Sequence, residues 1–501
     1  MNETYQKLQK YLDKESALEV ALALLGWDAE TLAPKQAVDH TSKAVGILAG
    51  EAYQTIINDE VKDLLSKLSL PEEQKTLTDV EQKIVKQLKK QYDDMEQIPI
   101  EEFQAYQELT AKAPSVWARA KEQKDFASFA PLLEEVFAYN IRFGKYRSKE
   151  GQQPYDVLLK DYEECFDAAS LDQFFEEVKA TIVPLLKKVS AKKDFIQDDF
   201  LYQCYDVKKQ DEFCRFLAEY IGFDFERGVL AESAHPFTNS LHNKDVRITN
   251  HYYEKNLASA IFSVIHEGGH ALYELGVADE LTMTPVGGGT SMGMHESQSR
   301  MYENMIGRSK EFWLPIYSKL QDTYPEQLNT VTLDTFIRAI NKAQSGLIRT
   351  ESDELCYCLH VIIRYEIEKD LFAGKITVNE LPTVWNQKYQ EYLGVTPADD
   401  AEGVLQDIHW SCGNVGYFPS YALGNAIAAQ MYAQMKKELP VDELLKEGNL
   451  KAIREYLNEH VHKFGKMKNT NEILMDMTGQ PLNAKYYTEY LVEKYTSLYE
   501  L

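Results

Sequence analysis

IFSVIHEGGHALY, residues 261–273, has the pattern of an α-helix that brings two imidazoles to one point. Its apolar residues recur at helical intervals, which predicts one buried face, and Gly276 follows where such a helix could end. His266 and His270 are four positions apart, so they stand one turn above each other on the same side of the helix. Both rings can therefore bind a single metal ion.

Zinc suits this pair of ligands. It prefers nitrogen and oxygen ligands in tetrahedral geometry, and a catalytic zinc keeps one position for water. Glu267 points roughly 100° away from His266 around the helix axis, so it is poorly placed to bind the ion but can reach that water. Zinc lowers the pKa of the water toward about 7, and the carboxylate can then take its proton. The alternative interpretation is a solvated helix face.

Two glycines, Gly268 and Gly269, lie inside this helix. Each costs roughly 1 kcal/mol relative to alanine. We therefore expect either substrate or a neighbouring segment to approach the helix closely here.

A third ligand is expected from a second helix, and Glu296 is the candidate by spacing. It begins a new helix beyond the glycine-rich segment 285–291. His295 beside it is the competing candidate, either as a ligand or as a group that supports or caps one. Glu274 is disfavoured because it continues the helix of the first two ligands.

Composition and charge limit the class of protein. The chain has 501 residues, of which 44% are hydrophobic, and a net charge of −25. This acidity argues against nucleic acid and anionic membranes as partners. The polar first residues and the lack of a long apolar run predict a cytoplasmic protein. The six scattered cysteines form no CxxC pair and are expected to be free, buried thiols.

The sequence predicts a mainly α-helical fold with one small β-sheet. Helical periodicity dominates from Tyr5 to about Val229 and returns beyond Met294. Asp245–Thr249 alternates polar and apolar residues, which predicts a strand, and a sheet edge there would allow an extended peptide to pair with it. No composition break divides the chain. We therefore expect one domain over 1–501, with a helical part at 1–230 and a zinc-site part at 231–501.

Proline positions predict several helix boundaries. We expect starts or connections at Pro71, Pro99, Pro114, Pro131 and Pro154. Pro184 is expected to kink or interrupt a helix.

Over its whole length the chain resembles the thermostable carboxypeptidase 1 (carboxypeptidase Taq) family of zinc metallocarboxypeptidases. The HExxH pentapeptide is one of several motifs that carry the resemblance. The others are His235-Pro236-Phe237, Asp245-Val246-Arg247-Ile248-Thr249, His295-Glu296-Ser297-Gln298, the segment from Ile348-Arg349 to Ser352-Asp353, and Gly403–Trp410.

The resemblance implies a zinc ion bound by His266, His270 and Glu296, with Glu267 as general base and general acid. Cobalt could substitute, since such ligands select weakly among similar ions. The resemblance further implies a large helical peptidase fold, in which the zinc helix forms the floor of a deep groove beside the small sheet. It also implies a homodimer. The broader architecture is similar to helical zinc peptidases that include oligopeptidases and angiotensin-converting enzyme.

The expected reaction is direct hydrolysis of the C-terminal peptide bond by water. The oxyanion needs donors besides the metal, and Tyr421 and His409 are the candidates because they lie in polar or glycine-flanked segments. Tyr421 could instead be a core tyrosine with a satisfied hydroxyl. His409 could instead be a structural partner of Asp407 or of a ligand. Asp407 itself is a candidate to support a ligand histidine.

An exopeptidase must also bind the terminal carboxylate of its peptide substrate, and a guanidinium does this through paired hydrogen bonds. Arg349 is the first candidate and Arg247 the second. Arg349 could instead bridge Asp353, and Arg247 could pair with Asp245. His235 is a further candidate for the groove, or simply a turn residue before proline.

Two other functions remain open at this point. An endo-acting zinc oligopeptidase would use the same scaffold with a groove that continues past the cleaved bond. A non-catalytic zinc-binding protein is the more remote alternative, because structural zinc usually has a fourth protein ligand, often cysteine, and none lies near this motif.

Overall fold

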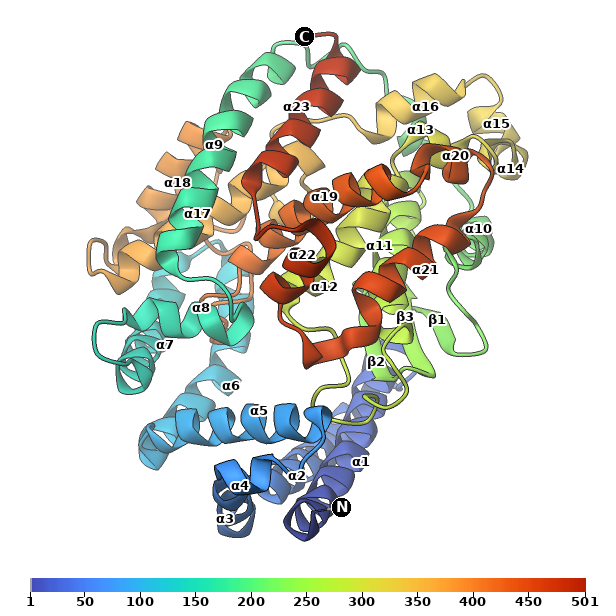
Figure 1. Ribbon diagram of the computed structural model, residues 1–501. Helices are drawn as coiled ribbons and strands as arrows, with labels where there is room; N and C mark the ends of the chain where they lie inside the picture. The colour runs from blue at the N-terminus through green and yellow to red at the C-terminus, as the bar shows by residue number, and fades with distance from the viewer. Residues whose placement is uncertain (1) are drawn as a thin grey trace.

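The HExxH stretch lies in α11 (Leu257–Leu275), a 19-residue helix that is buried along most of its length. Asn256 caps its start by accepting a hydrogen bond from the Ser259 amide, and Gly276 ends it as the sequence predicts. The computed structural model describes residues 2–501. In Figure 1, α11 lies deep in the molecule, surrounded by other helices.

The first five helices form a layer at the end of the molecule where the chain begins (Figure 1). They are α1 (Glu3–Thr31), α2 (Val38–Ile56), α3 (Asp59–Leu68), α4 (Pro71–Gln74) and α5 (Asp79–Glu96). Their apolar side chains form a cluster of their own, which also includes Val277, Leu281 and Val286 from the segment after α11. This layer is therefore packed directly onto the connection between the two metal-ligand helices.

The next five helices contradict part of the proline prediction. They are α6 (Ile100–Gln123), α7 (Phe126–Arg147), α8 (Pro154–Tyr162), α9 (Ala168–Ser190) and α10 (Val207–Ile221). Pro71 and Pro154 begin helices and Pro99 caps one, as expected. Pro114 and Pro131 instead lie inside α6 and α7, which continue through them, and Pro184 lies within a helix, as expected, without interrupting α9. Burial of these long helices offsets the cost of about 3 kcal/mol for an interior proline.

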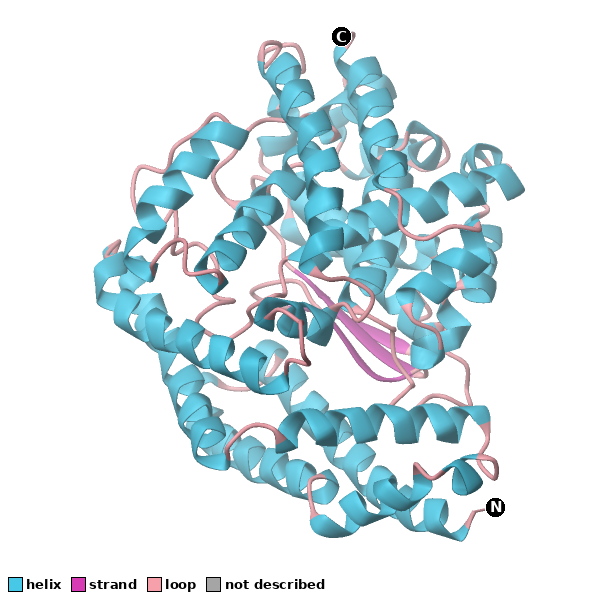
Figure 2. Cartoon of the chain, turned by 60° about the vertical axis from the view of Figure 1, so that its left-hand side comes forward, coloured by secondary structure: helices cyan, strands magenta, loops and turns pink. Residues whose placement is uncertain are grey.

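The small sheet has three strands, β1 (Gly228–Glu232), β2 (Thr238–His242) and β3 (Asp245–Asn250), in the order β1-β3-β2. β1 runs parallel to β3, and β2 runs antiparallel to it. The strand predicted at 245–249 is present, but it is central. β1 and β2 are the edges of the sheet, and the Asn239 side chain of β2 donates to the Ala23 carbonyl of α1 at 3.0 Å. Figure 2 shows the sheet between the first helices and the rest of the molecule.

The second half of the chain is helical, as predicted. It comprises α12 (Met292–Arg300), α13 (Lys310–Trp313), α14 (Tyr317–Thr323), α15 (Pro325–Leu328), α16 (Leu333–Ile340), α17 (Glu354–Phe372), α18 (Leu381–Tyr392), α19 (Pro419–Glu438), α20 (Val441–Lys446), α21 (Leu450–His460), α22 (Thr470–Thr478) and α23 (Ala484–Tyr499). A π-helical turn, Met301–Ile306, extends α12. Together with α9, α10 and α11 these helices enclose the main apolar core.

Two further expectations concern the cysteines and membrane-spanning segments. All six cysteines are free, but Cys204 and Cys412 are exposed rather than buried. Over residues 2–501, no helix combines the length and the apolar character that crossing a bilayer requires.

Candidate active site

The three predicted metal ligands meet at one point. Their candidate ligand atoms all lie within 4.8 Å of one another. Oε2 of Glu296 is 3.8 Å from Nε2 of His266 and 3.5 Å from Nε2 of His270. α11 supplies the two imidazoles and α12 supplies the carboxylate, as the sequence predicts.

This donor set fits a zinc ion. Ligand atoms at about 2.0–2.2 Å from a tetrahedral zinc lie roughly 3.3–3.6 Å from each other, close to the spacings between Glu296 and the histidines. Burial lowers the pKa of His270 to about 3, so its ring is neutral and able to bind a metal at neutral pH. Burial opposes ionisation of Glu296, but Arg300 and both histidines overcome it and hold its pKa below the usual range.

The two ligand histidines are oriented by different groups. Nδ1 of His266 is 2.9 Å from Oε2 of Glu303, which lies in the π-helical turn after α12. Arg300 and Arg308 each donate a hydrogen bond to Glu303, at 3.1 and 3.0 Å. Such a partner fixes the tautomer and the ring orientation of a ligand histidine. Nε of Arg300 also donates to Oε1 of Glu296 at 2.6 Å, so one guanidinium connects both carboxylates.

His270 is oriented through a second imidazole. Its Nδ1 is 2.6 Å from Nδ1 of His295, and Nε2 of His295 is 2.8 Å from Oε1 of Glu274. His295, the competing ligand candidate, therefore supports a ligand. Glu274, which the sequence disfavours as a ligand, ends this chain of hydrogen bonds. The prediction that Asp407 supports a ligand histidine is wrong, because Glu303 and His295 occupy those positions.

Glu267 lies beside the ligands without joining them. It is buried, and its Oε2 accepts a hydrogen bond of 2.6 Å from the Thr238 hydroxyl of β2. Burial raises the pKa of Glu267, while His266 and Thr238 oppose that shift. A carboxyl group with a raised pKa accepts and releases protons more readily near neutral pH.

The glycines of the HExxH motif are explained by close packing. A Cβ at Gly269 would lie 2.7 Å from Cα of Ser299 and 2.8 Å from the Gln298 carbonyl oxygen. A Cβ at Gly268 would lie 2.3 Å from a methyl group of Ile221. The close approach expected from the sequence is therefore that of α12 and α10.

A buried charge cluster lies next to the metal centre. Arg349 is 5% exposed and donates to Oδ1 of Asp407 at 3.0 Å and to the Tyr357 hydroxyl at 3.1 Å. Arg364 donates to the other oxygen of Asp407 at 2.7 Å. The alternative pairing of Arg349 with Asp353 is not formed, because Asp353 caps the start of α17. Asp407 is thus shared between two guanidinium groups.

Tyr421 and His409 lie together at this cluster. Nε2 of His409 is 3.2 Å from the Tyr421 hydroxyl, and the guanidinium of Arg349 lies 4.8 Å from the centre of the Tyr421 ring. Burial lowers the pKa of His409 to about 4, with Arg349 acting in the same direction. The imidazole is therefore neutral at physiological pH.

The remaining two candidates lie apart from this cluster. Arg247 forms two hydrogen bonds of 2.8 Å with Asp245. This pairing is the alternative to substrate binding that the sequence suggests. His235 is exposed at the turn before β2, and its carbonyl accepts a hydrogen bond from Ser233. Within residues 2–501, no described contact connects the His235 side chain to the metal ligands.

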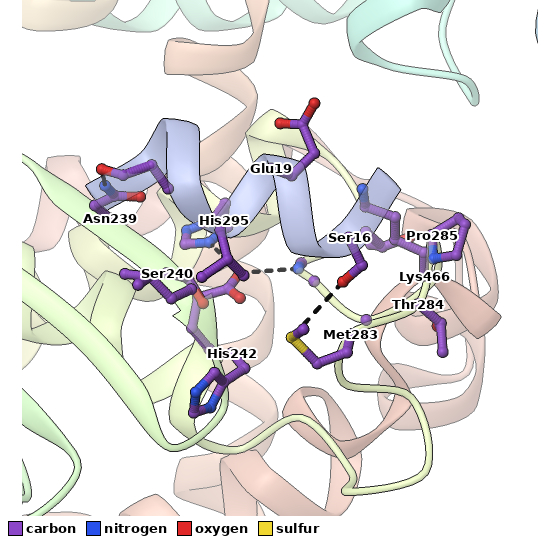
Figure 3. Close-up of a pocket in the computed structure, with 18 of the residues that line it drawn as sticks. Ser16, Glu19, Asn239, Ser240, His242, Met283, Thr284, Pro285, His295 and Lys466 are labelled. Atoms are coloured by element: carbon purple, nitrogen blue, oxygen red, sulfur yellow. Dashed lines mark hydrogen bonds and ion pairs between the residues drawn. The ribbon is translucent and has the colours of Figure 1, made fainter. Parts of the chain in front are cut away.

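A cavity of about 760 Å³ lies beside the centre, lined by α1, β2 and the segment between α11 and α12, and it reaches His295 and Glu274 but none of the three metal ligands. Figure 3 shows side chains that line this cavity, among them Ser16 and Glu19 of α1, Ser240 of β2 and His295 of α12. Its position between the small sheet and the first helices matches the groove that the resemblance implies.

Several residues of the site were not predicted, although helical spacing could have identified two of them. Arg300 and Glu303 follow Glu296 by four and seven positions, so they share its face of the helix. Thr238 and Tyr357 come from distant segments, and nothing in their local sequence indicates their contacts.

Comparison with known proteins agrees with this geometry. The family model described as "Carboxypeptidase Taq (M32) metallopeptidase" matches residues 7–495. The chain is 43% identical to carboxypeptidase 1 of Bacillus subtilis over 500 residues, which covers 99% of each chain. It is 33% identical to thermostable carboxypeptidase 1 of Pyrococcus furiosus over 497 residues, again with 99% of each covered.

Solved structures share the fold. The crystal structure of the M32 carboxypeptidase from Deinococcus radiodurans superposes with a TM-score of 0.95 at 33% identity, covering 99% of this chain and all of that one. Since the family model and these relatives span almost the whole sequence, the chain belongs to the carboxypeptidase Taq family of metallopeptidases and is an enzyme of the metallocarboxypeptidase class.

Proposed function

We propose that this protein is a zinc-dependent carboxypeptidase that releases C-terminal residues from peptides by direct attack of water. The observation that carries the proposal is the meeting of His266, His270 and Glu296 beside the buried carboxyl group of Glu267. Zinc held by these three side chains would polarise the scissile carbonyl and lower the pKa of a water molecule.

Glu267 acts as the general base and then as the general acid. It takes a proton from the attacking water and delivers it to the leaving amine, so no covalent intermediate forms. Two features support this role. Its raised pKa allows the carboxyl group to take up and release a proton closer to neutral pH. The Thr238 hydroxyl occupies one carboxylate oxygen, so the other oxygen remains for the attacking water.

Tyr421 and His409 stabilise the oxyanion. The neutral His409 ring and the Tyr421 hydroxyl are within hydrogen-bond distance of each other, so one can hold the other in a donating orientation. Both groups are half-buried, which strengthens such hydrogen bonds by lowering the local dielectric constant.

Arg349 binds the terminal carboxylate of the substrate. It shares Asp407 with Arg364, so the cluster carries two positive charges against one negative charge. This net positive charge can attract the terminal carboxylate of the substrate, although the protein as a whole is acidic. Arg247 is the weaker candidate because Asp245 alone balances its charge, whereas two guanidinium groups share Asp407.

β2 holds the upstream part of the substrate. The Thr249 amide donates to the Phe237 carbonyl, so odd-numbered residues of this strand pair with β3. The backbone groups of Thr238 and Ser240 therefore point away from β3, on the side of the cavity that they line. An extended peptide can add there as a further strand.

The test of this function is a time course of one peptide followed by mass spectrometry. We expect a ladder of products, each shorter by one residue at the C-terminus. The ladder should vanish with a chelator and return with added zinc, and cobalt should also restore it. Internal fragments would instead favour the endo-acting oligopeptidase, and binding of zinc without any product would favour the non-catalytic alternative.

We also propose that the protein forms a homodimer through α2. This helix exposes Ile47 (63%) and, on the same face, Ala44 and Gly50. Lys43 and Glu51 stand four positions on either side of Ile47 and are both exposed. If two copies of α2 pack antiparallel about Ile47, Lys43 of each faces Glu51 of the other. This charge complementarity favours a second copy of the chain as the partner. The single-domain organisation and the cytoplasmic location stay predictions.

A further inference from the structure

Glu163 is a buried acid that the proposed mechanism does not use, and it lies where two helices of the site begin. It follows α8 and is 2% exposed. Its Oε1 accepts a hydrogen bond of 2.5 Å from the amide of Gly293, the second residue of α12. Ser291 and Ser420, at the starts of α12 and α19, lie near this carboxyl group, but Ser291 pairs with the Thr470 hydroxyl, and Oε2 of Glu163 has no hydrogen-bond partner among the described residues.

The carboxyl group of Glu163 is held by the Gly293 amide, and no described salt bridge involves it. Burial raises its pKa to about 7. The start of a helix carries partial positive charge and favours an acid there. The start of α12 is thus stabilised by Glu163.

Gly293 is fitted closely to this acid. A Cβ at position 293 would lie 2.9 Å from Oε1 of Glu163 and 3.2 Å from its carboxyl carbon. Any side chain at this position would therefore displace either Glu163 or the start of α12.

The two helices meet again at the metal centre. A Cβ at Gly424 of α19 would lie 2.5 Å from Cγ of Glu296, so the two backbones approach closely at the ligand. Tyr421 stands about one turn before Gly424 on α19. A shift at the start of α12 would therefore move Glu296 against α19.

We propose that Glu163 is a positioning residue, whose carboxyl group fixes the start of α12 and so sets Glu296 against the ligand histidines. For its effect on kcat this rests on the proposed function. For metal binding it requires no turnover.

The test compares Glu163→Ala, Glu163→Asp and Gly293→Ala with Glu164→Gln, the exposed neighbour. Zinc alone is the probe, and its dissociation constant is measured by competition with a chromophoric chelator. On the zinc-loaded enzyme, kcat and KM are measured with one short peptide, well below the Tm of each variant. Aspartate keeps the charge but is one methylene too short to reach Gly293.

Groups that orient metal ligands contribute about 10- to 100-fold to affinity or activity. We expect zinc to bind roughly tenfold more weakly to Glu163→Ala and Gly293→Ala, and less weakly than that to Glu163→Asp. We expect kcat to fall while KM changes by less than about twofold. Glu163→Gln, whose amide oxygen can still accept a hydrogen bond from Gly293, should recover most of the zinc affinity and most of kcat. Glu164→Gln should equal the wild type in both.

An unchanged zinc constant in Gly293→Ala and in the Glu163 variants, with only a lower Tm, would overturn the proposal. If Glu163→Ala does not fold, the Gly293→Ala and Glu163→Asp constants decide alone. If the wild-type enzyme has no chelator-sensitive carboxypeptidase activity while the zinc constants shift as expected, the proposed function fails and the positioning role stands.

Discussion

At the scale of single residues, the site places carboxyl groups in contrasting environments. Glu296 and Glu303 have lowered pKa values because charged partners overcome burial. Glu267 has a raised pKa because burial dominates. Groups whose environments separate their pKa values take different chemical roles, which fits two carboxylates that bind or orient and one that transfers protons.

Glu267→Gln is therefore expected to keep zinc and lose turnover. Loss of a general base typically costs about 10²–10⁴-fold in kcat. Zinc content by atomic absorption should stay at the wild-type level, since this side chain is not a ligand. Activity close to the wild-type value in a zinc-loaded sample would exclude Glu267 as the base.

Arg349→Ala should lose discrimination for a free C-terminus. A hydrogen bond to a charged group contributes about 1.5–3 kcal/mol, which corresponds to a rise of about 10- to 100-fold in KM. The measurement compares a peptide with its C-terminal amide, and Arg247→Ala serves as the matched variant. Equal losses on both peptides would assign the anchor elsewhere.

Glu368 gives a pH-dependent prediction. It accepts hydrogen bonds from Trp410, Tyr155 and the Gly416 amide, and burial raises its pKa to about 7. The folded state therefore holds this proton more tightly than the unfolded chain. The stabilising contribution is complete below about pH 4.5 and is lost as pH rises through about 7, by at most about 3 kcal/mol.

In Glu368→Gln this loss is absent. Relative to the wild type, its Tm should rise steadily between about pH 5 and 7.5, whatever the absolute offset. Thermal unfolding measured across that range checks the slope, with exposed Glu391→Gln as the control. A constant offset would show that Glu368 is ionised throughout.

At the scale of elements, regular spacing was the reliable signal. α11 was predictable because its apolar period, its histidine pair and Gly276 all indicate the same helix. β1 and β2 were not predicted, because short strands owe their position to pairing with β3 rather than to a pattern of their own. Pro114 and Pro131 were placed wrongly for the same reason, since packing outweighed a local preference.

The packing of α11 on α12 can be tested with a glycine pair. Gly269→Ala puts a methyl group against the backbone of α12, and overpacking of this kind costs about 1–3 kcal/mol. Gly26→Ala in α1 meets nothing within 4 Å and should be neutral or stabilising by up to about 1 kcal/mol. Chemical denaturation compares the two. Equal free energies of unfolding for the two variants would show that α12 moves aside for the added methyl group at no measurable cost.

At the scale of the whole molecule, the sequence predicted the helical class and the three ligands, but not the groups that connect distant segments. Asp407 shows why. Its partners Arg349 and Arg364 come from separate elements, so no local pattern indicates that it balances guanidinium groups rather than a ligand histidine. Likewise, the contact of Thr238 with Glu267 exists only once β2 lies along α11.

The proposed dimer is a prediction at this scale. Ile47→Glu should give monomers in light scattering coupled to size exclusion, with an unchanged circular dichroism spectrum. Lys43→Glu and Glu51→Lys should each weaken the dimer, because like charges then face each other twice. The double variant should restore it. The exposed pair of Lys14 with Glu51 within one chain is too weak to mask this effect.

The edge strand has a consequence for what the enzyme can digest. Main-chain amides and carbonyls are the same in every residue except proline, so contacts made through Thr238 and Ser240 carry no information about side chains. The pairing register shifts between Ser240 and His242. Main-chain pairing of this kind is therefore limited to a short segment of the substrate. If β2 holds the substrate as proposed, the side chains of the upstream residues should have little effect on the rate, and a proline a few residues upstream of the cleaved bond should slow the enzyme.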